Sequence, residues 1–127
     1  MTFGKILNCT QHIVTPEQRR AGIIDLGRKS KRKLSWLMTF KGEPNYKEVQ
    51  KRADSIALLI HKEYGNFLDG VMIGGAHFLM SSLEQSLKKY GYEVCYPFGV
   101  KMRIEANEFS KTTRFKHQGL VWAKSLD

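Results

Sequence analysis

Residues 69–96 read DGVMIGGAHFLMSSLEQSLKKYGYEVCY, and this stretch decides the fold class. The apolar run at 71–73 is typical of a buried strand, and the glycine pair Gly74-Gly75 ends it. Leucines that recur every four residues predict a helix over 78–90, and a further strand is expected over 92–96. A helix between two strands implies a crossover connection, so we expect the two strands to lie parallel in one sheet.

The segments before this unit predict similar elements. Residues 3–9 (FGKILNC) are expected to form a strand. Thr15 and Gln18 then stand at the spacing of a capping box, which starts a short helix that ends near Gly22. Residues 23–27 (IIDLG) leave the choice between helix and strand open.

Two more helices are expected in the middle of the chain. Residues 34–40 place their apolar side chains on one helical face. Asn45 is a suitable N-cap with Glu48 at the capping-box position, and a four-turn apolar stripe follows until Gly65.

The last third of the chain changes pattern. Pro97 is expected to end the strand at 92–96. Residues 100–106 alternate between apolar and polar side chains, which predicts a half-exposed strand, and 112–122 are expected to supply another. The whole sequence, 1–127, therefore predicts one α/β domain. We expect a small Rossmann-like fold whose mainly parallel sheet is flanked by helices, with an edge strand or hairpin at its C-terminus.

The net charge of +9 is unevenly distributed, because residues 1–41 hold nine basic and two acidic side chains. The densest cluster is a basic run with the side chains Arg28, Lys29, Lys31, Arg32 and Lys33. Such a run attracts phosphates, and it is equally typical of a solvated surface segment. Trp36 and Phe40 follow it and offer aromatic faces for stacking, so nucleic acid is one expected partner.

Cysteine use and hydropathy narrow the cellular setting. Cys9 and Cys95 lie in or beside expected strands, which favours buried thiols in a reducing compartment and a cytoplasmic protein. The four histidines are scattered and no CxxC pair occurs, so neither a metal nor another cofactor is expected. No apolar stretch reaches about 18 residues, and we expect no membrane partner.

Three loops at strand ends are the candidate sites, since ligands of open parallel sheets bind beyond the carboxyl ends of the strands. They are residues 8–14, residues 74–77 and residues 97–99. The second loop has the strongest signal, because two glycines lead directly into a helix whose free N–H groups favour an anion. A tight turn without any ligand is the alternative interpretation of a glycine pair. The predicted ligand-binding residues are Asn8, Thr10, Gln11, His12, Gly74, Gly75, Ala76, His77 and Ser81.

Catalysis, if it occurs, is expected to be independent of metal. A ribose 2′-hydroxyl can attack its own phosphodiester when it is held in line, with cationic groups steadying the charge. His12, Lys101 and Arg103 are the candidate catalytic residues for such a step.

Two motifs resemble a small uncharacterised family of phages and mobile elements, with the patterns LNxTQHxxTxEQ and IGGAxFLMxxLE. The chain matches them at Leu7, Asn8, Thr10, Gln11, His12, Thr15, Glu17, Gln18, Ile73, Gly74, Gly75, Ala76, Phe78, Leu79, Met80, Leu83 and Glu84. Gly99 stands where the family pattern has a hydroxyl side chain. More distantly, the layout is similar to compact CRISPR-associated Rossmann-fold proteins and ring nucleases. That resemblance implies a homodimer that binds, sequesters or cleaves a cyclic oligonucleotide messenger.

The leading functional hypothesis is therefore a protein of phage–host defence, in the host cytoplasm if phage-encoded, that binds a cyclic nucleotide or oligonucleotide and sequesters or cleaves it. A basic nucleic-acid-binding protein is the second hypothesis. An inhibitor that binds an acidic surface of a host defence protein is the third.

Overall fold

A computed structural model describes the backbone of residues 5–105 and 111–123, and the side chains of these residues apart from 100–118. The elements follow one another as β1 (Ile6–Cys9), α1 (Pro16–Arg20), β2 (Ile23–Asp25), α2 (Arg28–Leu37), α3 (Tyr46–Tyr64), β3 (Gly70–Ile73), α4 (His77–Lys89), β4 (Val94–Glu105) and β5 (Lys111–Ala123). Among the described residues, no helix is long and apolar enough to cross a membrane.

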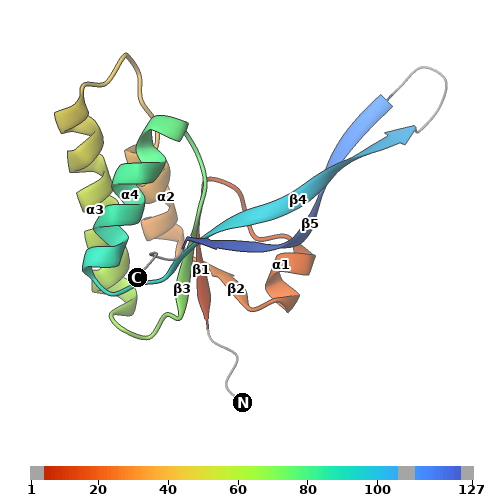
Figure 1. Ribbon diagram of the computed structural model, residues 1–127, viewed down its shortest axis with the longest axis horizontal. Helices are drawn as coiled ribbons and strands as arrows, with labels where there is room; N and C mark the ends of the chain where they lie inside the picture. The colour runs from red at the N-terminus through yellow and green to blue at the C-terminus, as the bar shows by residue number, and fades with distance from the viewer. Residues whose placement is uncertain (1–4, 106–110, 124–127) are drawn as a thin grey trace.

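One mixed sheet organises the chain, in the strand order β2-β1-β3-β4-β5. The first four strands run parallel, whereas β5 runs antiparallel to β4 and forms a long hairpin with it. Figure 1 shows this hairpin extending away from the helices. The predicted α/β class, with a mainly parallel sheet and a C-terminal hairpin, is confirmed.

The helices cover the two faces of the sheet unequally. Helices α2, α3 and α4 lie on one face and α1 on the other (Figure 1). The larger core lies under the three helices, where Leu7, Val71 and Val94 of the strands meet the apolar stripes of α3 and α4. The smaller core, on the α1 face, consists of Val14, Ile23, Met72 and Cys95. Because side chains alternate along a strand, strands β1, β2, β3 and β4 each contribute apolar side chains to both cores.

Local capping signals are confirmed at two helix starts. Thr15 and Gln18 make the reciprocal bonds of a capping box at α1. The side chain of Asn45 accepts a hydrogen bond of 2.8 Å from the backbone N–H of Glu48 at the start of α3. The Glu48 carboxylate forms an ion pair with Arg52 at 3.3 Å.

Three sequence interpretations change. Residues 23–25 form strand β2, because they pair with β1 in parallel register. The basic run is the first part of helix α2, which begins six residues before the expected start at residue 34. Pro97 does not end its strand: β4 continues to Glu105, and Pro97 pairs with Leu120 of β5. Beyond Cys95 the strand pairs with β5 alone, and a proline without an N–H is tolerated where one edge is free.

Side chains tie the helical layer together. Arg52 of α3 donates from Nη1 to the carbonyl oxygens of Trp36, Leu37 and Thr39 at 2.9–3.1 Å, and it thereby caps α2. The guanidinium also lies 4.7 Å from the Trp36 ring centre, a cation–π distance. These contacts anchor the C-terminal end of the basic helix to α3.

A second tie joins β4 to α4. The Tyr96 hydroxyl donates to Oε2 of Glu84 at 2.9 Å. Burial and this hydrogen bond raise the pKa of Tyr96 to about 12. Burial alone raises the pKa of Glu84, but the hydrogen bonds from Lys88 and Tyr96 outweigh it and lower the pKa. The pair therefore stays in the hydrogen-bonding state, a neutral phenol with an ionised carboxylate, at neutral pH.

Candidate functional site

The carboxyl ends of β1 and β3 are neighbours, and the chain leaves them toward opposite faces of the sheet. After β1 it passes to α1 on one face, and after β3 it enters α4 on the other face. Ligands of open α/β sheets bind at such a switch point. The two loops touch there, since a Cβ atom added to Gly74 would lie 3.4 Å from Cγ2 of Thr10. We call residues 8–13 and 74–77 the switch-point site.

The N-terminus of α4 opens onto this site without a side-chain cap. Ala76 occupies the N-cap position in an extended conformation, and no side chain among the described residues caps the first turn by a hydrogen bond. The first turn also contains no acidic residue. Gly75 has a φ of 149°, a backbone conformation that side chains other than glycine rarely adopt. The uncapped N–H groups and the helix dipole together favour an anion at this position.

Asn8 organises the first loop from below. Its side chain is buried, and its Nδ2 donates to the carbonyl of His12 at 2.6 Å and to Oδ1 of Asp25 at 2.8 Å. Its Oδ1 accepts from Oγ1 of Thr10 at 2.6 Å and from the Thr10 backbone N–H at 3.2 Å. Asn8 and Thr10, which the sequence predicted as ligand-binding residues, are thus engaged in shaping the loop.

Two residues of this network were missed from the sequence. Asp25, at the end of β2, accepts from the backbone N–H of Val14 at 3.3 Å as well as from Asn8. Lys31 of α2 donates to the carbonyls of Thr10 and His12 at 2.9 and 3.0 Å and lies 3.6 Å from Asp25. Lys31 therefore points inward, unlike its neighbours in the basic run. Its spacing to the buried Leu34 and Met38 on one helical face was the available signal.

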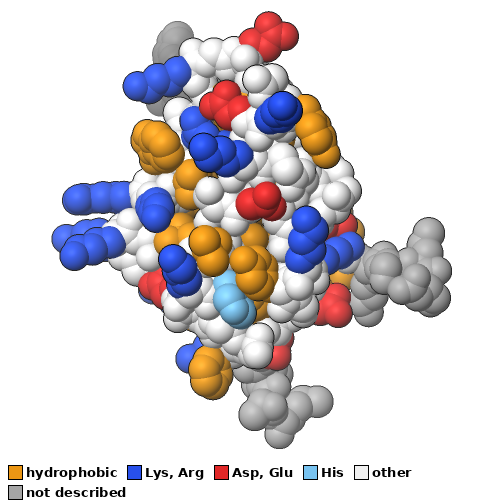
Figure 2. All heavy atoms as spheres, turned by 90° about the vertical axis from the view of Figure 1, so that its left-hand side faces the viewer, with side chains coloured by type: hydrophobic (Ala, Val, Ile, Leu, Met, Phe, Trp, Pro, Cys, Tyr) orange, Lys and Arg blue, Asp and Glu red, His pale blue; other side chains and the backbone are white. Residues whose placement is uncertain are grey.

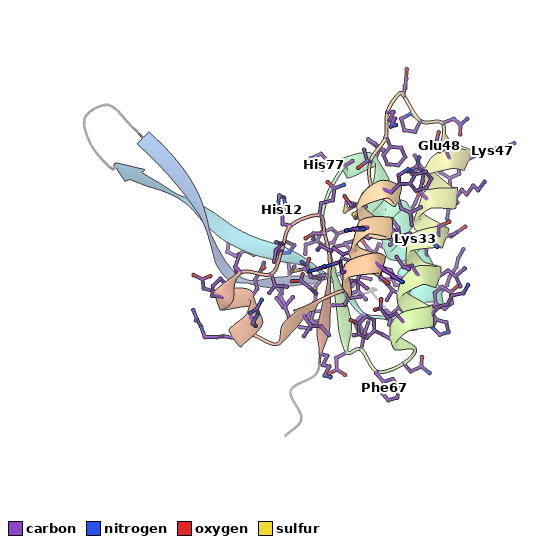
Figure 3. The ribbon with its side chains drawn as sticks, turned by 180° about the vertical axis from the view of Figure 1, so that it is seen from behind. His12, Lys33, Lys47, Glu48, Phe67 and His77 are labelled. Carbon is purple, nitrogen blue, oxygen red and sulfur yellow. The ribbon has the colours of Figure 1, made fainter. Side chains whose placement is uncertain are left out.

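The hydrogen bonds of Asn8, Asp25 and Lys31 hold the first loop so that its tip is exposed. Gln11, His12 and Ile13 are exposed, and the Gln11 carboxamide reaches the end of α2, donating to Ser35 and Thr39. His77, the first residue of α4, is exposed as well. Figure 3 shows His12 and His77 at the same edge of the sheet. The two histidines that the sequence placed in separate loops thus lie on loops that meet at one edge of the sheet.

The other predicted residues lie elsewhere. Ser81 is exposed one turn further along α4, beyond the switch-point site itself. Lys101 and Arg103 belong to the outer part of β4, and their side chains lie outside the described residues. The expected third loop at 97–99 is strand, with a register shift between Phe98 and Gly99.

The two thiols are not available as nucleophiles in the folded protein. Cys9 and Cys95 are completely buried, one in each core. Burial raises the pKa of each thiol to about 12, so almost no thiolate exists at neutral pH. Burial and the raised pKa values therefore disfavour cysteine-based covalent catalysis by either thiol.

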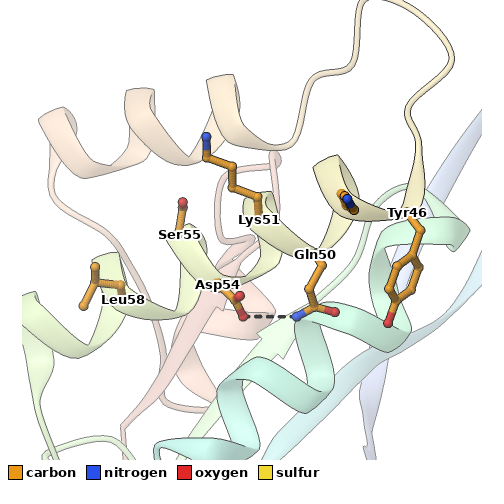
Figure 4. A pocket seen from close by; sticks show the side chains of 7 residues that line it. Tyr46, Gln50, Lys51, Asp54, Ser55 and Leu58 are labelled. Carbon is orange, nitrogen blue, oxygen red and sulfur yellow. Dashed lines mark hydrogen bonds between the residues drawn. The ribbon is translucent and has the colours of Figure 1, made fainter.

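A separate hollow lies on the outer surface of α3, away from the strand ends. It is lined by Tyr46, Lys51, Asp54 and Leu58 among others, and Gln50 donates to Asp54 at 3.1 Å across it (Figure 4). Asp54 also accepts from Ser86 of α4 at 2.7 Å. This bond makes the carboxylate part of the contact between two helices, so we assign no chemistry to the hollow.

Comparison with known proteins supplies a family without a described activity. No curated protein and no solved structure matches the chain. A family model does match, and it spans both loops of the switch-point site together with the strands and helices that carry them. Because this model covers residues 4–121, the chain belongs to the Uncharacterized protein MJ1673 family.

Proposed function

We propose that the switch-point site binds a phosphate-bearing nucleotide, and specifically a cyclic oligonucleotide second messenger. The observation that carries the proposal is the uncapped N-terminus of α4, which follows Gly74-Gly75 at the point where the chain leaves β1 and β3 toward opposite faces. A phosphate there accepts hydrogen bonds from backbone N–H groups and meets the positive end of the helix dipole. The proposed setting is phage–host defence, in line with the family resemblance of the two motifs.

The exposed side chains of the site suit a ligand with more than one phosphate. His12 and His77 each present an imidazole at the same edge of the sheet as the α4 N-terminus (Figure 3). Gln11 extends the polar surface toward the end of α2. Imidazole N–H groups donate to phosphate oxygens, so one phosphate at α4 and a second near His12 would both be held.

The proposal includes a second activity, cleavage of the bound ligand. The ribose 2′ oxygen would form a bond to phosphorus while the bond to the 5′ oxygen breaks, which leaves a 2′,3′-cyclic phosphate and a 5′-hydroxyl. His12 would accept the 2′ proton, and water would supply the proton that the departing 5′ oxygen takes up. Lys101 and Arg103 remain the proposed cationic partners of this step.

The proposed active form is a homodimer. Phe98 of β4 and Val121 of β5 expose 52% and 54% of their surface at the base of the hairpin. They lie on the same face of the antiparallel pair, since Phe98 pairs with Gly119 two residues away from Val121. An exposed apolar pair of this kind suits a two-fold contact, and a symmetric cyclic ligand suits a two-fold axis.

Replacement of both imidazoles tests the site directly. We expect His12→Ala with His77→Ala to weaken binding of a cyclic oligonucleotide by at least about tenfold, because two charge-assisted donors are lost. The measurement is thermal shift and calorimetry with cyclic mono-, di-, tri-, tetra- and hexanucleotides, followed by chromatography of the products. Linear products would add the cleavage activity, and intact ligand would leave a sequestering protein.

The matched control is Lys47→Ala with Lys62→Ala, which removes two exposed cations from α3. This control should bind as tightly as the original protein. A panel in which no cyclic nucleotide stabilises the unmodified protein would overturn the proposed function. Equal losses in both double variants would show only a general charge effect.

Helix α2 favours a second candidate function, binding of nucleic acid. Its first turn contains Arg28 and Lys29 and no acidic residue, although cations are unfavourable at a helix N-terminus. Arg32, Lys33 and Trp36 continue the exposed surface of the same helix. Figure 2 shows Lys and Arg side chains projecting along one margin of the helical face. A phosphate backbone would neutralise these charges while Trp36, 65% exposed, offers a face for base stacking.

Neutralisation of this surface is expected to abolish such binding. The variant changes Arg28, Lys29, Arg32 and Lys33 to glutamine and keeps Lys31, which holds the first loop. If all four contact phosphates, the slope of log K against log salt for duplex DNA should become less steep by about 3.6. The control changes the exposed Lys47, Lys51, Lys62 and Lys89 instead. Binding that is unchanged by the α2 variant, measured by fluorescence anisotropy, would discard this candidate.

A further inference from the structure

A groove lies between the N-terminal parts of α3 and α4, next to the proposed phosphate position. Its lining includes Asn45, Tyr46 and Val49 on the α3 side, and Phe78, Ser81 and Gln85 on the α4 side. Phe78, Ser81 and Gln85 are spaced three and four residues apart, so they share one face of α4. The groove therefore follows the first two turns of the helix whose N-terminus opens onto the switch-point site.

Two aromatic side chains border this groove and remain largely exposed. Tyr46, the first residue of α3, exposes 75% of its surface, and Phe78, the second residue of α4, exposes 51%. The ring of Phe78 makes an edge-to-face contact with Phe40, with 5.0 Å between the two ring centroids, and this contact fixes its position. Val49 is buried and forms an apolar floor. Exposed aromatic faces over an apolar floor are the surface on which a nucleobase stacks.

Three hydrogen-bonding side chains that line the groove are free within the described part of the chain, whereas Asn45 is engaged as the N-cap of α3. Among the side chains that the structure describes, none forms a hydrogen bond with the Ser81 hydroxyl, the Gln85 carboxamide or the Tyr46 phenol. In this respect they differ from Asn8 and Thr10, which are engaged in the first loop. A glutamine carboxamide can donate and accept at once, which matches the N6 and N7 atoms at one edge of adenine.

The groove is within the reach of a nucleotide bound at the start of α4. Phe78 is three residues after Gly75, and Ser81 lies about 4.5 Å beyond Phe78 along the helix axis, at 1.5 Å per residue. We propose that the groove is the base-binding subsite of the switch-point site and that it takes an adenine base. This inference rests on the proposed function, because the phosphate of the same nucleotide would lie at the α4 N-terminus.

Amide chemical shifts distinguish the phosphate position from the groove. The ¹⁵N-labelled protein is titrated with ribose 5-phosphate, which has no base, and with adenosine 5′-monophosphate at the same concentrations. We expect ribose 5-phosphate to shift the amide signals of residues 75–78 alone. The adenine nucleotide should shift these signals and, in addition, those of residues 45–49 and 81–85.

Each outcome has a separate meaning. Shifts confined to residues 75–78 with both probes would overturn the groove as a base site and leave the phosphate site intact. Shifts confined to the groove would support the base site and overturn the phosphate site. An absence of shifts with both probes would overturn both proposals.

Substitution of Tyr46 supplies the second measurement. Tyr46→Ala should weaken binding of adenosine 5′-monophosphate about tenfold and leave binding of ribose 5-phosphate unchanged. Tyr46 is preferred to Phe78 because its ring is more exposed, so its loss should not unfold the protein. The matched control is Phe67→Ala, an aromatic residue with 86% of its surface exposed at the opposite end of the sheet (Figure 3). Equal binding by the Tyr46 and Phe67 variants would overturn the inference.

Discussion

Replacement of Asn8 by aspartate is expected to lower the free energy of unfolding by about 3 kcal/mol at pH 7, a large effect for a change of one atom. Asn8 donates to Oδ1 of Asp25 at 2.8 Å, and an aspartate at this position would place a second carboxylate there without the donor. The position is 1% exposed, so water would screen the repulsion poorly. Lys31, 3.6 Å from Asp25, would offset only part of it.

The loss should depend on pH with a definite sign. Repulsion and burial would raise the pKa of the new carboxyl group in the folded state above its value of about 4 in the unfolded chain. The penalty is therefore absent below the unfolded pKa and grows as the pH rises through the folded pKa. The difference in unfolding free energy between the variant and the original protein should be smaller at pH 5 than at pH 7, measured by urea denaturation.

Asn45→Asp is the matched control for this experiment. Asn45 caps α3 by accepting a hydrogen bond from Glu48, and aspartate is an equally good N-cap. Its unfolding free energy should stay within about 0.5 kcal/mol of the original. If Asn8→Asp proved as stable as this control at pH 7, the first loop would not depend on the Asn8–Asp25 contact.

The Asn8→Asp variant should also weaken ligand binding, since Asn8 holds the carbonyl of His12.

Replacement of Gly70 by valine should be the second severe change, with a loss of about 2–3 kcal/mol. Gly70 begins β3, and a Cβ atom there would lie 2.6 and 2.7 Å from Cη2 and Cζ3 of Trp122. Contacts this short do not occur, so the indole of β5 would have to leave its place over the sheet. Strand β4 lies between Gly70 of β3 and Trp122 of β5. The absence of a side chain at Gly70 therefore leaves the space that the indole of the C-terminal hairpin occupies.

A second substitution should relieve the clash. Trp122→Ala in the Gly70→Val background is expected to destabilise far less than the sum of the two single changes, with a coupling of about 1–3 kcal/mol. Gly42→Val is the control, because a Cβ atom at Gly42 meets nothing within 4 Å. The unfolding free energies of the single and double variants are measured by urea denaturation. If the losses of the two single variants simply added up in the double variant, the contact between Gly70 and Trp122 would be contradicted.

Much of the fold was predictable because its signals are local. The capping box of Thr15 and Gln18 and the apolar stripe of α3 each depend on residues three or four apart. The glycine pair Gly74-Gly75 likewise predicted the end of β3 and the start of α4. Strand Ile23–Asp25 was not resolved in advance, because three residues are too few for a pattern and its pairing with β1 decides its conformation.

The candidate site was predictable only in part. Two of the three expected loops were found because they follow apolar runs, and His12 and His77 lie at one edge of the sheet. The third, at 97–99, is part of strand β4. The sequence did not separate Asn8 and Thr10, whose polar atoms hold the loop, from His12, which is exposed. It also treated Lys31 as one cation among five, whereas the structure turns this residue inward toward Asp25.

The sequence by itself determined the α/β class, the order of helices and strands apart from β2 and the start of α2, and the glycine break before α4. These properties follow from periodicity and capping, which act over one or two turns of chain. Tertiary structure alone decided the strand order, the extension of β4 beyond Pro97, and the groove between α3 and α4. These depend on pairing and packing between residues far apart in the chain, where the energy of a contact is set by both partners and by the water that they exclude.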